Sequence, residues 1–75
     1  MRRNTKLPKA LGKIIQRRRK ELKLTQEELA EKIGISRVYM GFVEQGRYAP
    51  SVEVIEKLAR ALRVPLSELF NFKKR

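Results

Sequence analysis

Two short segments between Thr25 and Gly46 constrain the fold most, because each is bracketed by residues that favour helix boundaries. Thr25 is followed three residues later by Glu28, a capping box in which each side chain satisfies a free backbone amide of the other. Gly34 can adopt the left-handed conformation that ends a helix, and Ser36 is a good N-terminal cap for the next one. Gly46 then stops the second segment. The pattern predicts two short helices joined by a tight turn.

Apolar residues in these segments recur at the spacing that fills the angle between two crossing helices. Ala30 stands where a larger side chain would push the helices apart. This combination is typical of the helix-turn-helix arrangement, here over residues 26–45. The inward positions are Leu29, Ile33, Ile35, Met40 and Val43.

The remaining segments also predict helices, so we expect an all-α fold, a compact bundle of about five helices. A first helix is expected from about Pro8 or Lys9 to Leu22, and Ser51 caps a fourth helix. Pro65 opens a short fifth helix. The predicted organisation is a basic flexible arm over residues 1–8, the helical domain over 9–71 and a basic tail over 72–75. The apolar stripes are Leu7, Leu11, Ile14, Ile15 and Leu22 on the first helix and Val52, Ile55, Leu58, Ala59 and Leu62 on the fourth.

The charge of the chain is concentrated at its start. The net charge is +11 in 75 residues, and residues 1–23 hold ten basic side chains and one acid, Glu21. Such asymmetry favours a polyanionic partner, either nucleic acid or an acidic membrane surface. Cys, His and Asp are absent, which argues against zinc sites, His-based triads and Cys nucleophiles, so we expect no enzyme, metal or cofactor. No apolar run is long enough for a membrane span.

With these capped helices and this spacing, the chain resembles a known family, the Cro/CI-type helix-turn-helix domains of the XRE transcriptional regulators. The resemblance covers roughly residues 10–71 and implies a lambda-repressor-like DNA-binding domain. The short length and the Arg37-x-Tyr39 pattern are most similar to the controller proteins of restriction–modification systems. The residues that carry it are Gly12, Arg19, Leu24 to Ala30, Gly34 to Ser36, Tyr39, Val43 to Gly46, Pro50-Ser51, Leu58-Ala59, Leu62 to Val64 and Leu69-Phe70.

The resemblance implies that the helix over residues 36–45 enters the DNA major groove by its N-terminal end. Arg37, Val38 and Phe42 are then the expected base contacts, since guanidinium can donate two hydrogen bonds to guanine. Arg37 remains open to interpretation as a plain surface arginine, and Phe42 as a core or dimer residue. Mid-helix Gly41 suggests a close approach to DNA or to another helix. Expected backbone contacts are Gln26, Ser36, Tyr39, Arg47, Tyr48 and, from an arm that otherwise gives only nonspecific attraction, Arg2, Arg3 and Lys6.

In the family a salt bridge joins the first helix to the recognition helix, and the matching residues here are Arg19 and Glu44. Two residues depart from the family pattern. Arg18 stands where an aliphatic residue is common, and Lys23 stands where a turn glycine is common and implies a modest backbone cost.

The expected function is a sequence-specific regulator that binds double-stranded DNA at an inverted-repeat operator as a homodimer, as repressor or autoregulator, in the cytoplasm (nucleoid-associated if prokaryotic). No small-molecule effector or membrane is expected. Alternatives are a protein-interaction module, such as an antitoxin or a coactivator, then RNA or anionic-membrane binding. The expected dimer interface is Leu66, Leu69, Phe70 (alternatively core) and Phe72.

Overall fold

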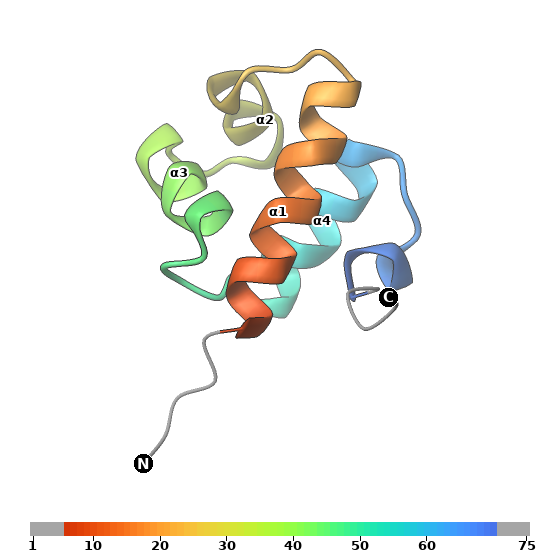
Figure 1. Cartoon of the computed structure of the whole chain (residues 1–75). Helices are drawn as coiled ribbons and strands as arrows, with labels where there is room; N and C mark the ends of the chain where they lie inside the picture. Colours follow the sequence, from red (N-terminus) through yellow and green to blue (C-terminus); the bar gives the residue numbers. More distant parts are fainter. Residues whose placement is uncertain (1–5, 71–75) are drawn as a thin grey trace.

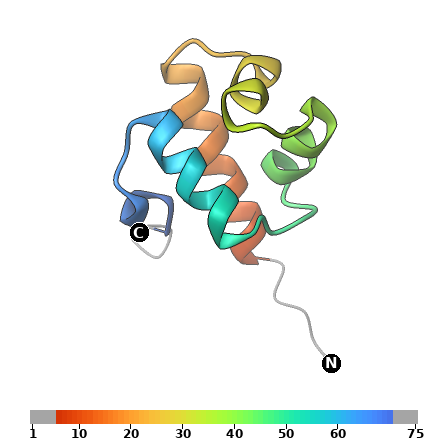
Figure 2. The same cartoon turned by 180° about the vertical axis from the view of Figure 1, so that it is seen from behind.

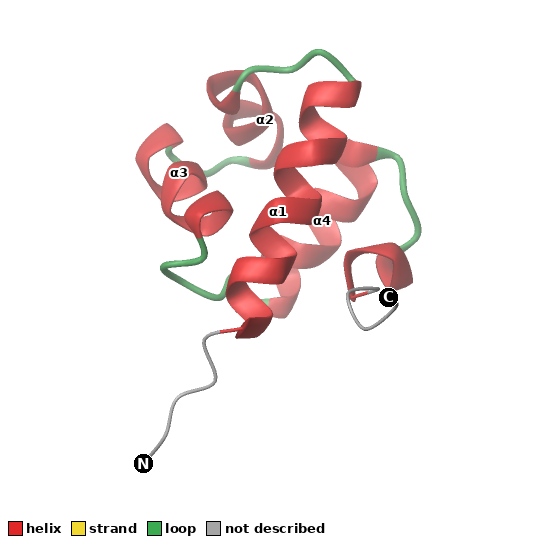
Figure 3. Cartoon of the chain, viewed as in Figure 1, coloured by secondary structure: helices red, strands yellow, loops and turns green. Residues whose placement is uncertain are grey.

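Four α-helices and one short 3₁₀ helix account for residues 6–70, the part of the chain that the computed structural model describes (Figure 1). No strand occurs in this part, which confirms the all-α class (Figure 3). The fifth helix expected after Pro65 is a 3₁₀ helix and not an α-helix. The elements are α1 (Lys6–Glu21), α2 (Gln26–Ile33), α3 (Arg37–Gln45), α4 (Val52–Leu62) and η1 (Leu66–Phe70).

Helix α1 begins earlier than the sequence indicated. It starts at Lys6 and not at Pro8 or Lys9, so residues 6–8 belong to the helix and not to an arm. Pro8 is compatible with this start because the first turn of a helix needs no intrahelical N–H donors. The end at Glu21 is within a residue of the expected end.

The N-terminal caps lie where the sequence places them. Thr25 and Glu28 form the complete capping box of α2, and the Ser36 and Ser51 hydroxyls accept hydrogen bonds from the third residues of α3 and α4. Each such cap contributes about 1 kcal/mol, because a free amide of the first turn gains a partner.

All four α-helices end in a Schellman turn. In each turn an amide past the helix donates to a carbonyl five residues back, as Ile35 does to Ala30 at 3.0 Å. Gly34 and Gly46 occupy the left-handed position of α2 and α3, with φ of 77° and 78°, as predicted. Lys23 and Arg63 occupy the same position after α1 and α4, with φ of 60° and 61°. The backbone cost expected at Lys23 is therefore present, and Arg63 carries another.

The core lies where α1 and α4 run side by side, with α2 and α3 on one side and η1 on the other (Figure 2). Leu69 is fully buried, so its assignment to a dimer interface is wrong, because the 3₁₀ turn directs this side chain into the core. Arg18 is partly buried and its Nη1 donates to Glu21 Oε1 at 2.8 Å. The buried apolar residues are Leu11, Ile14, Ile15, Leu29, Ala30, Ile33, Met40, Val43, Ile55, Leu58, Ala59, Leu62 and Leu69.

Gly12 sets the distance between α1 and α3. A Cβ at this position would overlap the carbonyl oxygen of Glu44 and lie 2.6 Å from that of Val43. The two helices therefore touch backbone to backbone at Gly12. This contact fixes α3 against the long first helix.

Among the described residues, no helix has both the length and the apolar character that a membrane crossing requires.

Candidate nucleic-acid interface

Helix α3 has one buried side and one open side. Met40, Val43 and Glu44 are buried against the rest of the domain. Arg37 and Val38 lie on the open side, and Val38 is 57% exposed. The helix thus presents a guanidinium and a bare β-branched side chain in its first turn, where a groove-binding helix would meet base edges.

A buried ion pair holds α3 on α1. Arg19 Nε donates to Glu44 Oε2 at 2.6 Å and Arg19 Nη2 donates to Glu44 Oε1 at 3.0 Å. The two side chains are only 9% and 1% exposed. Arg19 Nη1 also donates to the Leu24 carbonyl at 2.7 Å, so the same guanidinium fastens the turn before α2. The pair that the resemblance implied is present, and it joins three elements.

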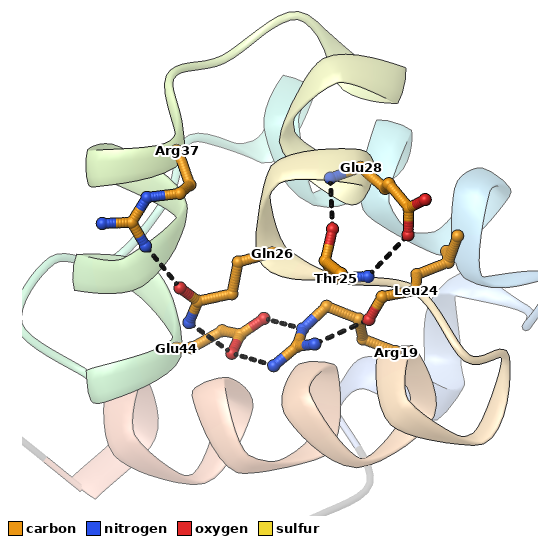
Figure 4. A network of polar contacts seen from close by, with 7 residues as sticks. All are labelled: Arg19, Leu24, Thr25, Gln26, Glu28, Arg37 and Glu44. Atoms are coloured by element: carbon orange, nitrogen blue, oxygen red, sulfur yellow. Dashed lines mark hydrogen bonds and ion pairs between the residues drawn. The ribbon is translucent and has the colours of Figure 1, made fainter.

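Gln26 extends this pair to the open surface (Figure 4). Its Nε2 donates to Glu44 Oε1 at 3.0 Å, and its Oε1 accepts from Arg37 Nη1 at 2.9 Å. The chain of contacts runs from Arg19 in α1 through Glu44 and Gln26 to Arg37 (Figure 4). Arg37 is thereby held at one nitrogen, which lowers the conformational entropy that it would lose on binding.

An aromatic cluster joins α3 to the loop that follows it. The Phe42 and Tyr48 rings meet edge to face with centroids 5.4 Å apart, and the Tyr39 and Tyr48 rings stack at 6.3 Å. The Arg47 guanidinium lies 5.1 Å above the Phe42 ring. Phe42 is therefore half-buried under the loop that follows α3 and is less open than a solvent-facing position would be.

The expected backbone contacts fall into two groups. Gln26, Ser36, Tyr39, Arg47 and Tyr48 border the open side of α3 or lie in the adjoining loop. The Ser36 hydroxyl accepts from the Tyr39 amide at 3.0 Å, so its first role is to cap the helix. The second group is the arm: Arg2 and Arg3 lie outside the described residues, and the position of Lys6 is known only as the start of α1.

Two of the four expected dimer residues are exposed. Leu66 is 40% exposed and Phe70 is 48% exposed, both on η1. Phe72 lies outside the described residues.

Sequence reasoning missed the side-chain network around Gln26. Only the positions of Gln26 and Arg37, each the first residue of its helix, hinted at a contact between them. It also missed the aromatic cluster, although Tyr39, Phe42 and Tyr48 are close in sequence.

These features define a helix-turn-helix domain, in which the short helix α3 is capped, fixed by a buried ion pair and open to solvent at its first turn. A comparison of families agrees, since residues 15–69 match the helix-turn-helix family model. The chain belongs to this family, in its Cro/CI or XRE type. The family consists of DNA-binding transcription regulators and not of enzymes, and this chain is one of them.

Similar proteins come from archaea and phages. An uncharacterized HTH-type transcriptional regulator of Methanothermobacter thermautotrophicus is 47% identical over 58 residues, which cover 76% of this chain and 84% of that protein. The immunity repressor of Bacillus phage phi105 is 44% identical over 59 residues, 79% of this chain but only 41% of the repressor.

Solved structures give the same fold. The restriction–modification controller protein C.AhdI of Aeromonas hydrophila superimposes with a TM-score of 0.82 at 37% identity and covers 89% of this chain and 100% of its own. The P22 c2 repressor, in a complex with a synthetic operator, has a TM-score of 0.77 at 31% identity over 81% of this chain and 92% of that one.

Proposed function

We propose that this chain is a sequence-specific repressor or autoregulator that reads the major groove of double-stranded DNA with α3, as a homodimer on an inverted repeat. The observation that carries the proposal is the Arg37 side chain, exposed in the first turn of α3 and steadied by Gln26. The repressor role draws support from two similar proteins, the phage phi105 immunity repressor and the P22 c2 repressor.

Arg37 is the main base reader in this proposal. One nitrogen contacts Gln26, and the remaining N–H groups of the guanidinium can meet the two acceptors on the major-groove edge of guanine. Val38 extends an apolar side chain from the same turn and suits contact with a thymine methyl group. Phe42 offers only the part of its ring that the loop leaves open.

The phosphate backbone is held from both sides of this reading turn. Gln26 and Ser36 border the N-terminal end of α3, and Gln26 Nε2 keeps a second hydrogen beyond the one donated to Glu44. Tyr39, Arg47 and Tyr48 border the other end. The arm residues Arg2, Arg3 and Lys6 add attraction to phosphates. Such contacts fix the register of the protein without reading sequence.

Dimerisation is proposed through the exposed apolar residues of η1, Leu66 and Phe70, together with Phe72. One domain reads too few base pairs for a unique site. In proteins of this kind two recognition helices meet half-sites about 34–36 Å apart, one turn of DNA.

Selection of bound duplexes from a random library at near-physiological salt tests the proposal. We expect an inverted repeat whose half-sites are centred about one helical turn apart. Recovery of no motif, with binding that disappears as salt rises, would leave only nonspecific attraction and would reject the proposal.

A further inference from the structure

Helix α1 carries a row of exposed cations. Lys9, Lys13, Arg17 and Lys20 recur at helical spacing and are all exposed; we call them the α1 ridge. None of the four forms an ion pair within residues 6–70. The row extends about 16 Å along the helix axis, at about 1.5 Å per residue.

Most of the ridge opposes the stability of its own helix, and only Lys20, in the last turn, is favoured by the helix dipole. Like charges at this spacing repel each other, and the positive end of the helix dipole disfavours a cation such as Lys9 in the first turn. The first turn of α1 also holds no acidic residue to compensate.

The four helices divide into two pairs by the charges of their first turns. Helices α2 and α4 follow the dipole, with Glu27, Glu28 and Glu53 in their first turns. Helices α1 and α3 have no acid there, and α3 begins with Arg37, the proposed base reader. In α3 the absence of an acidic residue from the first turn coincides with the proposed contact to DNA. Helix α1 also has no acidic residue in its first turn.

The ridge begins beside the proposed interface. The backbone of Lys9 packs against Gly46, since a Cβ on that glycine would lie 2.7 Å from Lys9 Cα. Arg47 and Tyr48, two of the proposed backbone contacts, follow Gly46 directly. From there α1 runs along one face of the domain, in front of α4 in Figure 1 and behind it in Figure 2.

We propose that the α1 ridge binds the sugar–phosphate backbone of the same DNA duplex, beyond the base pairs that α3 reads. Each strand of duplex DNA carries a phosphate about every 3.4 Å along its axis, so a row of this length spans several phosphates. The inference rests on the proposed function and extends its footprint along the duplex.

The chain offers a matched control. The ridge variant replaces Lys9, Lys13, Arg17 and Lys20 with Gln. The control variant removes the same number of cations from α2, α4 and the residue that follows α4: Lys32→Gln, Lys57→Gln, Arg60→Gln and Arg63→Gln. These four are also exposed. Circular dichroism with thermal unfolding confirms that both variants are folded before binding is compared.

Binding is measured by fluorescence anisotropy over a range of salt concentrations, on two duplexes. The short duplex holds only a site recovered by selection, and the long one adds about 10 base pairs at each end, one helical turn. For the wild type we expect tighter binding and a steeper salt slope on the long duplex. The ridge variant should lower that slope by about 0.9 for each lost phosphate contact and reduce the advantage of the long duplex. The control variant should keep this advantage.

Equal losses in the ridge and control variants would mean that net charge alone matters and would overturn the proposal. A complex that contains two labelled duplexes, with an affinity that does not depend on flank length, would also overturn the proposal. The ridge would then bind a second duplex and not the one that α3 reads. Failure of the proposed function is a separate result, seen when no sequence is preferred. The two variants can then be compared on duplexes of unrelated sequence, because phosphate contacts carry no sequence information.

Discussion

Gly12 and Gly41 both lie inside helices, but the space around their Cα atoms differs. A Cβ on Gly12 would overlap the backbone of α3, whereas a Cβ on Gly41 would meet only the end of the Gln26 side chain, at 3.8 Å. Gly12 is therefore required by the fold. Gly41 is buried, yet a Cβ there would make only an ordinary van der Waals contact, so packing within the described domain does not require a glycine. We propose that its small size serves a close approach to DNA, the alternative being an approach to another helix.

The glycines give the first prediction. Gly12→Ala should lower the free energy of unfolding by about 1–3 kcal/mol through overpacking. Gly41→Ala should raise it by about 0.5–1 kcal/mol through the gain in helix propensity, yet weaken DNA binding. Urea unfolding and anisotropy titration measure the two effects. A Gly41→Ala variant that is more stable and binds equally well would show that Gly41 serves no approach to DNA.

The Arg19–Glu44 pair gives a second prediction. Removal of either partner leaves a buried charge unpaired, so Arg19→Ala and Glu44→Ala should each lower the free energy of unfolding by about 3–5 kcal/mol. The double variant should lose clearly less than the sum. Arg19→Lys keeps the charge but not the two-pronged geometry, and it provides a milder variant if the alanine forms do not fold. Additive losses would mean that the pair contributes no coupling.

At the scale of elements, helix ends were the features most predictable from sequence. Thr25, Ser36, Gly34 and Gly46 occupy the predicted cap positions, because capping depends on local backbone groups that neighbouring residues supply. The start of α1 and the burial of Leu69 were mispredicted. Both depend on how a short or terminal segment packs on the rest of the chain, which local spacing does not determine.

A third prediction concerns backbone strain at the residues that follow α1 and α4. Lys23 and Arg63 hold the left-handed conformation that glycine adopts without a Cβ penalty. Lys23→Gly and Arg63→Gly should each raise the free energy of unfolding by about 0.5–1 kcal/mol. Lys57→Gly, inside α4, should lower it by a similar amount and serves as the control. Thermal unfolding of the three variants measures these changes in stability. A loss of stability in Lys23→Gly or Arg63→Gly would contradict the prediction.

The interface is the part that sequence described least well. The resemblance implied the roles of Arg19, Glu44 and Arg37. It did not reveal that Gln26 connects them, since that contact depends on the crossing of α2 and α3. The aromatic cluster of Phe42 and Tyr48 likewise depends on the path of the loop after α3.

At the scale of the whole molecule, a small domain must hold its reading surface and its pairing surface on one core. We predict a dimer at micromolar concentration, through Leu66 and Phe70 of η1. Leu66→Glu and Phe70→Glu should shift the equilibrium toward monomer, because they place charges in a desolvated contact, whereas Val52→Glu, at an exposed apolar position on α4, should not. Analytical ultracentrifugation measures this. A wild-type monomer, with and without DNA, would contradict the dimer.

The central claim is that α3 reads bases through Arg37. Its most direct test is the binding free energy of wild type and Arg37→Ala on a selected site and on all its single-base variants. We expect Arg37→Ala to lose about 1–3 kcal/mol on the selected site and to stop discriminating at one base pair of each half-site, while discrimination elsewhere persists. Arg60→Ala, an exposed arginine on α4, should leave the whole profile intact. A uniform loss across all sites in Arg37→Ala would assign Arg37 to the phosphate backbone and contradict the claim.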